Sequence, residues 1–378
     1  MNTIDCKTAE LWEAVKALRH ELHRHPELSG QEVETKKRLM AFIRAQSHLK
    51  IVDQSDWFYA LYEPAKRNGE APVAFRADMD ALLVPETIAL PYGSVRTDVA
   101  HKCGHDGHAA ALAALAVLLE SDSQVRRPVY LIFQSAEETG KGGKPCADFL
   151  RETAVSAVYA CHNLSGYPES AVMVRDGLTQ CASTGLLVTF HGERAHAGTP
   201  EDGHNPAAAI AELALFANQL QDDQAGRLCT VVYMQAGHLD FGIAPGDGAI
   251  GLTLRTTSDD DLAAMEQAIR LRAGQLAASS GLRTDFAVYD PFPATVNDPQ
   301  CAAAVRQAAA ALGLTVADMP EPWRPSEDFG WYTQVRSGAM FYVGNGIHWP
   351  MPHQPGFDFN DRILQTIASV FLKLAETR

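Results

Sequence analysis

The sequence predicts an α/β protein in which a mostly parallel mixed sheet, flanked by helices, is interrupted by an inserted βαββαβ domain of the ferredoxin-like type. Two observations carry this prediction. Strand-like apolar runs and helical patterns alternate through the first 160 residues, as they do in folds built on parallel sheets. A complete unit with a different order of elements then occupies residues 180–290. Such an insertion is tolerated because the two ends of a compact domain often lie close together.

Residues 1–179 are predicted to form the first part of the α/β domain. Apolar residues recur at helical spacing in four segments, and short apolar runs lie between or after them. The predicted helices cover residues 8–25, 31–46, 105–120 and 143–152. The predicted strands are "PVAF" (72–75), "PVYLIF" (128–133) and "VSAVYA" (155–160).

Residues 180–290 form the predicted insert, and residues 291–378 return to the first domain. Within the insert, strand, helix, strand, strand, helix and strand follow one another, which is the order of a split βαβ sandwich. Its second helix opens on Ser258 and three aspartates, a favourable N-terminal cap for the helix dipole. The elements predicted after the insert are a helix (299–312), a charged turn "RPSEDFGWY", a strand (339–344) and a helix (361–376). These elements are expected to complete the first domain's sheet.

Composition excludes several classes of protein. The chain has 378 residues and a formal net charge of −14, which argues against a nucleic-acid partner or an anionic membrane surface. The N-terminus lacks the basic start and apolar core of a signal peptide, and the longest apolar stretch, residues 109–119, is too short to span a membrane. The seven cysteines are scattered, so the sequence predicts reduced thiols and a cytoplasmic location. Five lack metal-binding spacing and are expected to be small core residues: Cys6, Cys146, Cys181, Cys229 and Cys301.

Polar side chains follow each predicted strand of the first domain at its carboxyl end, where ligands bind in open α/β sheets. The groups placed there are Asp78 and Asp80 after "PVAF", Glu137 and Glu138 after "PVYLIF", and His162 after "VSAVYA". The turn "HKCGHDGH" (101–108) opens the predicted helix 105–120 and should begin at the same edge. These groups are therefore expected to meet in one site.

Thiolate, imidazole and carboxylate groups gathered in one place suit Zn²⁺ or a similar divalent transition metal ion. The candidate ligands are Cys103, His105, Asp106, Glu137, Glu138 and His162. A single tetrahedral site would not use so many groups, whereas two ions about 3.5–4 Å apart that share a bridging ligand would. One of the adjacent glutamates can then bind metal while the other takes a proton from metal-bound water.

Each of these features also has an ordinary structural interpretation. Adjacent glutamates commonly mark a solvated surface, and a His-Asn pair after a strand can cap a turn. His20, His23 and His25 lie on or just after an amphipathic helix and are interpreted as structural. The stretch "HELHR" ends in arginine where a zinc-binding His-Glu-x-x-His motif needs its second histidine. The convergence of several groups at matching strand ends favours the functional interpretation.

Other catalytic and phosphate-binding motifs are missing from the sequence. It contains no Gly-x-Ser-x-Gly sequence of the kind that positions a nucleophilic serine. The stretch "GKGGKP" (140–145) lacks the upstream glycine of a phosphate-binding loop, and Lys144 is followed by Pro145 rather than Ser or Thr. No Gly-x-Gly-x-x-Gly sequence follows a predicted strand.

Eight segments, spread over nearly the whole chain, resemble the di-metal aminoacylase/carboxypeptidase family of zinc-peptidase-like amidohydrolases. They are "LHRHPELSGQE", "FRADMDAL", "HKCGHDGHAA", "FQSAEE", "CHNL", "AHAGTPEDGHNPAAA", "SEDF" and "HQPGFDFND". Within this family, Cys-Gly-His-Asp resembles the branch that cleaves N-acyl amino acids, hippurate and auxin–amino-acid conjugates. The resemblance implies a catalytic domain, an inserted lid/dimerisation domain, and a homodimer or higher homo-oligomer.

The resemblance also implies two divalent metal ions per chain, zinc or manganese. The implied ligands are Cys103 as a bridging thiolate, His105 and His162 at one ion, and Glu138 and His353 at the other. Glu137 would be the general base, and Asp80 would orient the His105 or Cys103 side of the site. Asp106 and His108 would orient the turn, and His101 would line the pocket.

For the insert, the resemblance implies residues that reach the substrate. His196 would stabilise the oxyanion, either across a dimer or after lid closure. Arg255 and Asn205 would bind substrate, Arg255 through a carboxylate, although a strand-end arginine can also be a plain surface residue. The sequence departs from the family pattern at Gly242, where an asparagine near the substrate is expected, and at Pro85, which is displaced along the chain.

Together these features predict a metal-dependent hydrolase of the amide bond in an N-acyl amino acid or a small aminoacyl conjugate. Metal-bound hydroxide would attack the carbonyl, and Glu137 would move the proton to the leaving amine. A dipeptidase or carboxypeptidase with the same di-metal core is the alternative enzyme. A catalytically silent binding protein of the same fold is the alternative outside enzymes, but it would have no need of Glu137.

Overall fold

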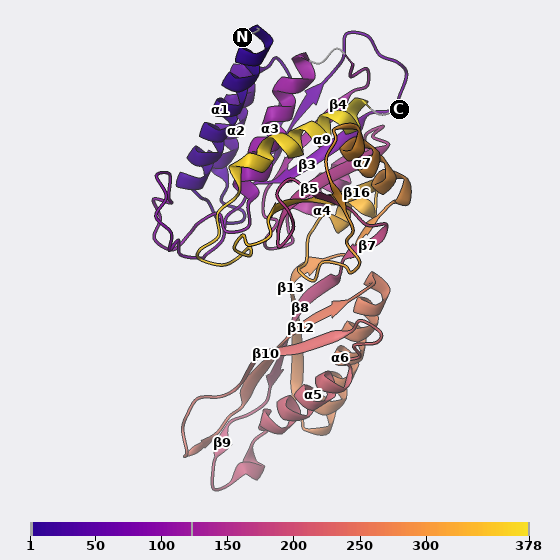
Figure 1. Ribbon diagram of the computed structural model, residues 1–378. Coiled ribbons are helices and arrows are strands. Elements are labelled where there is room, and N and C mark those ends of the chain that lie inside the picture. The colour runs from indigo at the N-terminus through magenta and orange to yellow at the C-terminus, as the bar shows by residue number, and fades with distance from the viewer. Residues whose placement is uncertain (1–2, 122–123, 377–378) are drawn as a thin grey trace. The chain divides into compact units, whose positions relative to one another are not determined.

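The computed structural model describes residues 3–121 and 124–376, which divide into two compact units (Figure 1). Unit 1 comprises Met1–Thr179, Thr295–Pro322 and Glu327–Arg378. Unit 2 comprises Gln180–Ala294 and Trp323–Ser326. Each unit has a hydrophobic core of its own.

Unit 1 is built on an eight-stranded mixed sheet in the order β1-β2-β4-β3-β5-β16-β6-β15. Its strands are β1 (Lys50–Asp53), β2 (Phe58–Tyr62), β3 (Val73–Asp78), β4 (Val129–Gln134), β5 (Ala157–Ser165), β6 (Val172–Met173), β15 (Val316–Ala317) and β16 (Ser337–Gly346). The central strands β4, β3, β5 and β16 run parallel. β1 and β2 form an antiparallel hairpin at one edge. A separate short pair joins β7 (Gly177–Gln180) to β14 (Thr295–Asn297).

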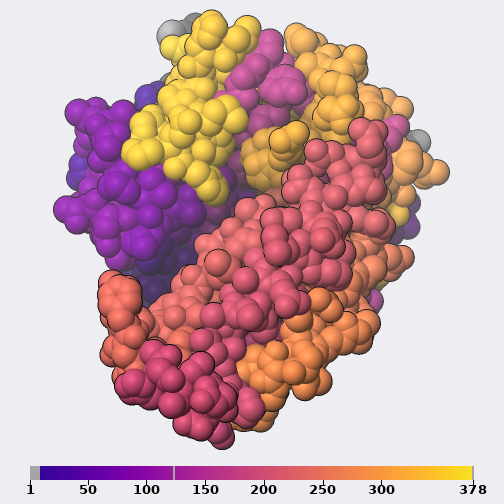
Figure 2. Space-filling model, turned by 90° about the horizontal axis from the view of Figure 1, so that it is seen from below, coloured from indigo at the N-terminus to yellow at the C-terminus, as the bar shows by residue number. Residues whose placement is uncertain are grey.

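Helices flank this sheet, as the sequence predicts. The helix α3 (His105–Ser121) packs against β3 and against three other helices: α1 (Thr3–Arg24), α2 (Val33–Gln46) and α9 (Leu364–Glu376). The helix α7 (Pro299–Ala311) packs against α9 and β16. The helices α4 (Gly143–Arg151) and α8 (Gly330–Thr333) pack against each other. In addition, α4 packs against β4, and α8 packs against β16. Figure 2 shows the C-terminal residues of unit 1, in yellow, beside its purple early segments.

The strand β3 shows how the sheet divides its side chains. All six of its residues are buried, and successive side chains point to opposite faces. Phe75 and Ala77 belong to the hydrophobic core that α3 covers. Arg76 and Asp78 lie on the other face, where the Arg76 guanidinium donates to the Asp78 carboxylate over 2.7 Å. The strand therefore carries two charged residues into the interior.

The predicted strand ends stop too early. β3 continues to Asp78 and β5 continues to Ser165, whereas the apolar runs end at residues 75 and 160. Apolar patterning misses these last residues because polar side chains that hydrogen bond with one another can be buried too. His162 therefore lies within a strand rather than after it. The hairpin β1-β2 was not predicted, because its first strand is short and only partly buried, which gives little alternation to detect.

Unit 2 is a four-stranded antiparallel sheet in the order β10-β12-β8-β13, covered by two helices (Figure 1). Its elements are β8 (Ala182–His191), α5 (Ala207–Gln219), β10 (Leu228–Ala236), β12 (Asp247–Thr256), α6 (Asp259–Ser279) and β13 (Arg283–Phe292). This confirms the predicted ferredoxin-like βαββαβ order. The Ser258 hydroxyl accepts from the Asp261 backbone N–H over 3.2 Å and caps α6. Outside the sheet, β9 (Ala195–His196) pairs with β11 (Ile243–Ala244) to form a short arm.

Six cysteines have described side chains, and all six are free thiols. Cys146, Cys229 and Cys301 are buried, as expected, and Cys181 is partly buried. Cys6 lies outside the residues whose burial is described. None of the described helices is both long enough and apolar enough to cross a membrane.

Candidate active site

The turn before α3 and the first turn of α3 each require a glycine. Gly104 has a φ of +110°, and a Cβ there would lie 2.0 Å from Asn163 Oδ1. A Cβ on Gly107 would lie 2.4 Å from the Phe359 ring. The residues of α3 that follow, from Ala109 to Ala116, are fully buried. Small residues therefore allow the turn and the helix to pack tightly against the sheet, which places Cys103 and His105 beside β5.

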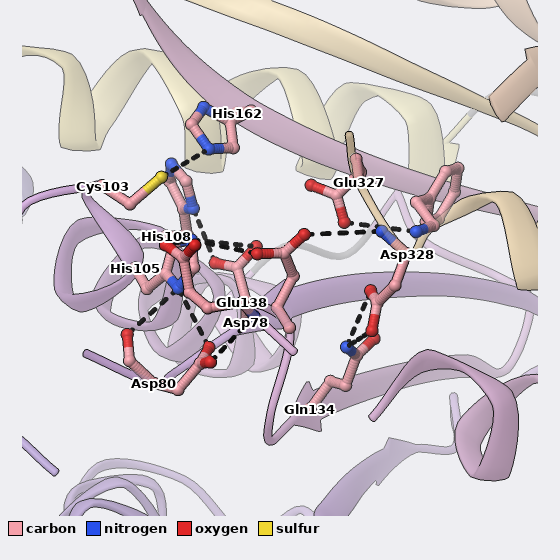
Figure 3. Close-up of polar contacts among 12 residues, drawn as sticks. Asp78, Asp80, Cys103, His105, His108, Gln134, Glu138, His162, Glu327 and Asp328 are labelled. Carbon is pink, nitrogen blue, oxygen red and sulfur yellow. Dashed lines mark hydrogen bonds and ion pairs between the residues drawn. The ribbon is translucent and has the colours of Figure 1, made fainter. Parts of the chain in front are cut away.

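Cys103, His105 and His162 form the first group of candidate ligands, and their donor atoms lie within 4.8 Å of one another. Cys103 Sγ lies 3.3 Å from His162 Nε2 (Figure 3). His162 Nδ1 donates to the Asn163 backbone carbonyl over 2.7 Å. His105 Nδ1 lies 3.0 Å from both the carbonyl oxygen and Oδ1 of Asp80. In both rings the Nδ1 contact fixes the tautomer and leaves the Nε2 lone pair directed at the site.

Cys103, Glu138 and His353 form the second group, again with donor atoms within 4.8 Å of one another. His353 Nε2 lies 3.5 Å from Glu138 Oε1. The proximity of Cys103 and Glu138 raises the pKa of His353 to about 10, so this point of the site favours positive charge. Cys103 belongs to both groups, which is the arrangement that a bridging ligand needs.

Glu137 lies at the edge of these groups and faces a different environment from Glu138. Its Oε2 is 3.8 Å from His105 Nε2, and its Oε1 accepts from the Asp328 backbone N–H over 3.4 Å. Burial raises the pKa of Glu137 well above its usual range, and the negative charges of Glu327, Glu138 and Asp328 add to this effect. A carboxylate with a raised pKa next to a ligand cluster is suited to accept a proton.

A fully buried arginine organises one side of the site. Arg76 Nη2 lies 2.7 Å from Asp328 Oδ1 and 2.9 Å from Glu327 Oε1, and its Nε donates to Gln134 over 2.9 Å. Its pairing with Asp78 completes the cluster. Sequence reasoning assigned no role to Arg76, Glu327 or Asp328. Arg76 could have been noticed because it directly follows the apolar run that begins β3. Glu327 and Asp328 lie in the motif "SEDF", which the sequence alone presents as a charged turn.

Two further groups of potential metal ligands are better explained by contacts within the protein. The first is Asp78 with His105 and His108, and the second is Glu137 with Glu327 and Asp328. In the first, Asp78 Oδ1 contacts His108 Nδ1 over 2.7 Å while Oδ2 accepts from Arg76 over 2.7 Å. His108 Nε2 in turn lies 2.7 Å from Asn163 Oδ1. In the second group, both Asp328 oxygens accept from Gln134 Nε2. Asp78, His108 and Asp328 therefore hold the surrounding structure in place.

The remaining donor atoms fit divalent metal ions. His105 Nε2 and Glu138 Oε1 are buried without a hydrogen-bond partner among the described residues, although buried polar atoms are normally paired. Six carboxylates and the Cys103 thiol gather here: Asp78, Asp80, Glu137, Glu138, Glu327 and Asp328. Arg76 balances part of this charge. Two cations bound by Cys103, His105, His162, Glu138 and His353 would balance more of it and would pair both orphaned atoms.

The other site residues suggested by the sequence belong to unit 2. His196 is exposed on β9, and its Nδ1 accepts from the Gly198 backbone N–H over 3.0 Å. Asn205 Oδ1 accepts from the Ala207 backbone N–H over 2.9 Å at the start of α5. Arg255 Nη1 donates to the Arg324 carbonyl over 2.6 Å and to Ser326 Oγ over 2.8 Å. Gly242 accepts from Ala197 through its carbonyl, in the same arm as His196.

Comparison with known proteins places this site in a family context. The chain is 29% identical over 367 residues to an N-acetylcysteine deacetylase of Bacillus subtilis, covering 95% of each chain. A crystal structure of a dinuclear metal-binding peptidase of Bacillus subtilis superposes with a TM-score of 0.82 at 26% identity, covering 97% of this chain and 98% of that one. An aminobenzoyl-glutamate utilization protein of Klebsiella pneumoniae shares the fold, with a TM-score of 0.76, 20% identity, and coverage of 99% and 98%.

A family model, Peptidase family M20/M25/M40, matches residues 74–377. The match includes every candidate ligand and Glu137, and it covers more than half of the chain. The chain therefore belongs to peptidase family M20/M25/M40 and is a metal-dependent hydrolase of amide bonds.

Proposed function

We propose that this hydrolase cleaves the amide bond of N-acyl amino acids or small aminoacyl conjugates. The observation that carries the proposal is the pair of ligand groups that share Cys103 and lie beside the buried Glu137. The deacetylase relative, which spans the same length, supports an N-acyl amino acid as the substrate class. A dipeptidase or carboxypeptidase activity at the same site is the alternative.

The proposed cofactor is a pair of divalent ions, zinc or manganese. The dinuclear relative supports this number, and the shared Cys103 supports a bridged pair. When bound, such ions polarise the substrate carbonyl and lower the pKa of water. Thiolate and imidazole ligands favour zinc, while carboxylates also suit manganese.

In the proposed mechanism, Glu137 accepts the proton of the attacking water and returns it to the leaving amine. Its burial excludes bulk water, which would otherwise compete for this proton. The Asp80 carboxylate accepts one hydrogen bond from His105 Nδ1 and another from the Glu138 backbone N–H, each over 3.0 Å. It therefore orients one residue of each candidate ligand group.

The arm of unit 2 supplies the proposed oxyanion donor. Because His196 Nδ1 accepts the Gly198 N–H, the neutral ring carries its hydrogen on Nε2 and can donate outward. Arg255 is proposed to bind the substrate carboxylate through the guanidinium nitrogens other than Nη1, which already contacts Arg324 and Ser326. Asn205 is proposed to contact the substrate through its amide NH₂ group.

We further propose a homodimer in which unit 2 provides the contact. β10 is an edge strand of its sheet, and it exposes apolar side chains that a second strand would cover: Leu228, Val232, Tyr233 and Met234. An apolar edge left uncovered is prone to pairing with another chain. An isologous pairing of two β10 strands, one from each chain, gives the β10 edge of both chains a hydrogen-bonding partner.

Replacing His196 by alanine is expected to leave metal content intact and to raise the activation barrier by about 2.7–4 kcal/mol, the usual loss for one oxyanion donor. Steady-state kinetics and metal analysis check this result. His191→Ala is the matched control, because His191 is also a histidine of unit 2 but pairs with Asp247 and Asp285. Turnover close to the wild-type value in His196→Ala would exclude the oxyanion role.

A dimer-borne donor has a further consequence. Glu137→Gln and His196→Ala chains should each be inactive, but a mixture should recover activity because one hybrid site carries both intact groups. No recovery after demonstrated subunit exchange would exclude donation from a partner subunit, and the donor would then have to come from the same chain.

The experiment that tests the function is a hydrolysis screen coupled to metal analysis. The protein is prepared with Zn²⁺ or Mn²⁺ and assayed against N-acyl amino acids, dipeptides and carboxypeptidase substrates. About two ions per chain and preferential cleavage of N-acyl amino acids are expected. Preference for dipeptides would favour the alternative enzyme, and metal binding without hydrolysis of any of these substrates would refute the proposed substrate class.

A further inference from the structure

The candidate ligand His353 is held differently from the other four. Its side chain is 54% exposed, whereas the Glu138 side chain is 12% exposed and Cys103, His105 and His162 are buried. It lies outside the helices and strands, on the loop between β16 and the C-terminal helical segment. Its φ of +67° is unusual for a residue with a side chain. The position of this ligand therefore depends on what fastens its loop.

Lys102 fastens the loop at two points. Its backbone carbonyl accepts from the His353 N–H over 2.6 Å. Its ammonium group donates to the Phe357 carbonyl over 2.7 Å. Lys102 is fully buried and directly precedes Cys103. One residue thus connects the turn that carries the shared ligand to the loop that carries His353.

The charge of Lys102 is balanced by a buried chain of ionic contacts. Glu86 Oε1 lies 2.5 Å from Lys102 Nζ and 2.9 Å from His23 Nε2. His23 Nδ1 lies 2.8 Å from Asp106, and Asp106 pairs with Arg19 Nε over 3.1 Å. Although burial opposes it, hydrogen bonding to His23 and Lys102 lowers the pKa of Glu86 to about 2. Lys102 therefore faces an ionised carboxylate.

This chain of contacts returns to the same loop. Arg19, which pairs with Asp106, also pairs with Asp358, the neighbour of Phe357. The Thr87 N–H, next to Glu86, donates to the Pro355 carbonyl over 3.2 Å. The network thus links both sides of the ligand turn, at Lys102 and Asp106, to the His353 loop.

We propose that Lys102 is a positioning residue that presents His353 to the metal ion bound by Cys103 and Glu138. The proposal rests on the proposed di-metal function. The backbone contact at His353 survives any substitution of Lys102, so the contribution of the side chain is its hold on Phe357 and on Glu86. Without these contacts, the loop that carries His353 is more flexible. Part of the binding free energy of this ion is then used to order the loop, and the ion binds more weakly.

The test uses full-length, metal-free protein titrated with Co²⁺, with equilibrium dialysis and the visible absorption of the bound ion as readouts. The wild type should bind two ions. Lys102→Met should weaken the ion held by Glu138 and His353 by about 10–100-fold, the usual effect of losing an outer contact to a ligand. The ion held by His105 and His162 should change little. His353→Ala identifies which transition belongs to which ion.

A double variant separates positioning from general destabilisation. If Lys102 acts through His353, Lys102→Met in the His353→Ala background should cause no further loss of Co²⁺ affinity. Lys36→Met is the matched control, because Lys36 is also buried and donates to a carboxylate, Asp53, and to a carbonyl, Ser55. It should lower thermal stability without changing either Co²⁺ affinity.

If Lys102→Met does not fold, the Lys102→Met/Glu86→Gln pair removes the uncompensated buried charge and keeps an acceptor for His23. Unchanged affinity for both ions in a folded Lys102 variant would overturn the positioning role while leaving the proposed function intact. Equal weakening of both ions would also overturn it. Fewer than two ions in the wild type would refute the di-metal function and, with it, this inference.

Discussion

Glu137→Gln is expected to lower turnover by roughly 10²–10⁴-fold while metal content stays unchanged, the range for a lost general base. The amide has nearly the shape of the carboxylate, and its oxygen can still accept the Asp328 N–H that now lies 3.4 Å from Glu137 Oε1. It cannot take a proton from water. The loss should appear in kcat, with KM little changed, because the substitution removes a group needed only as the reaction proceeds.

Glu138→Gln is the matched comparison for this result. The two glutamates are adjacent, yet Glu138 lies with Cys103 and His353 in one ligand group, whereas Glu137 contacts the Asp328 backbone. Glu138→Gln should therefore lose bound metal as well as activity. Metal analysis and steady-state kinetics on both variants decide the matter. Equal loss of metal in both variants, with turnover retained in Glu137→Gln, would reverse the assignment.

The sequence predicted the fold class because its strongest patterns report burial. The central strands are apolar over most of their length, and α3 is apolar from Ala109 to Leu119, so both stand out without a structure. The edge hairpin β1-β2 was missed because a short, partly exposed strand leaves a weak pattern. The residues at the ends of β3 and β5 were placed after the strands because they are polar, although the structure buries them in the sheet.

The candidate site residues differ in how readily the sequence alone identifies them. Cys103 and His105 share a local motif, and Glu138 follows a strand, so spacing and topology single them out. His353 lies 250 residues beyond Cys103 on an irregular loop, and only the family resemblance pointed to it. The M20/M25/M40 match now confirms that resemblance, while the role of each residue stays a prediction.

Buried charged residues were the part of the site that the sequence predicted least. A sequence does not distinguish a charged residue that solvent surrounds from one that a partner neutralises inside the protein. Arg76 meets Asp328 from 252 residues away, and Lys102 meets Phe357 from 255 residues away. Such pairs follow from the packing of the whole domain rather than from local pattern. They nevertheless decide how the candidate ligands are held.

Cys103→Ser is expected to remove most of both bound ions and, with them, most of the activity. Cys103 is the one residue common to both candidate ligand groups, so its loss should affect both ions, unlike the loss of His162 or His353. A serine hydroxyl stays protonated near neutral pH and is a poor substitute for a bridging thiolate. Metal ions supply several kcal/mol to such reactions, so turnover should fall by about 10³-fold or more.

Metal content by elemental analysis and initial rates at fixed added metal check this prediction. Cys301→Ser is the matched control, because Cys301 and Cys103 are each 6% exposed and Cys301 lies in α7, outside both ligand groups. The control should tolerate a buried hydroxyl at some cost in stability while keeping two ions. If Cys103→Ser also keeps both ions and normal turnover, Cys103 does not bridge. If it loses one ion only, Cys103 binds a single metal, and the second group would need another ligand in its place.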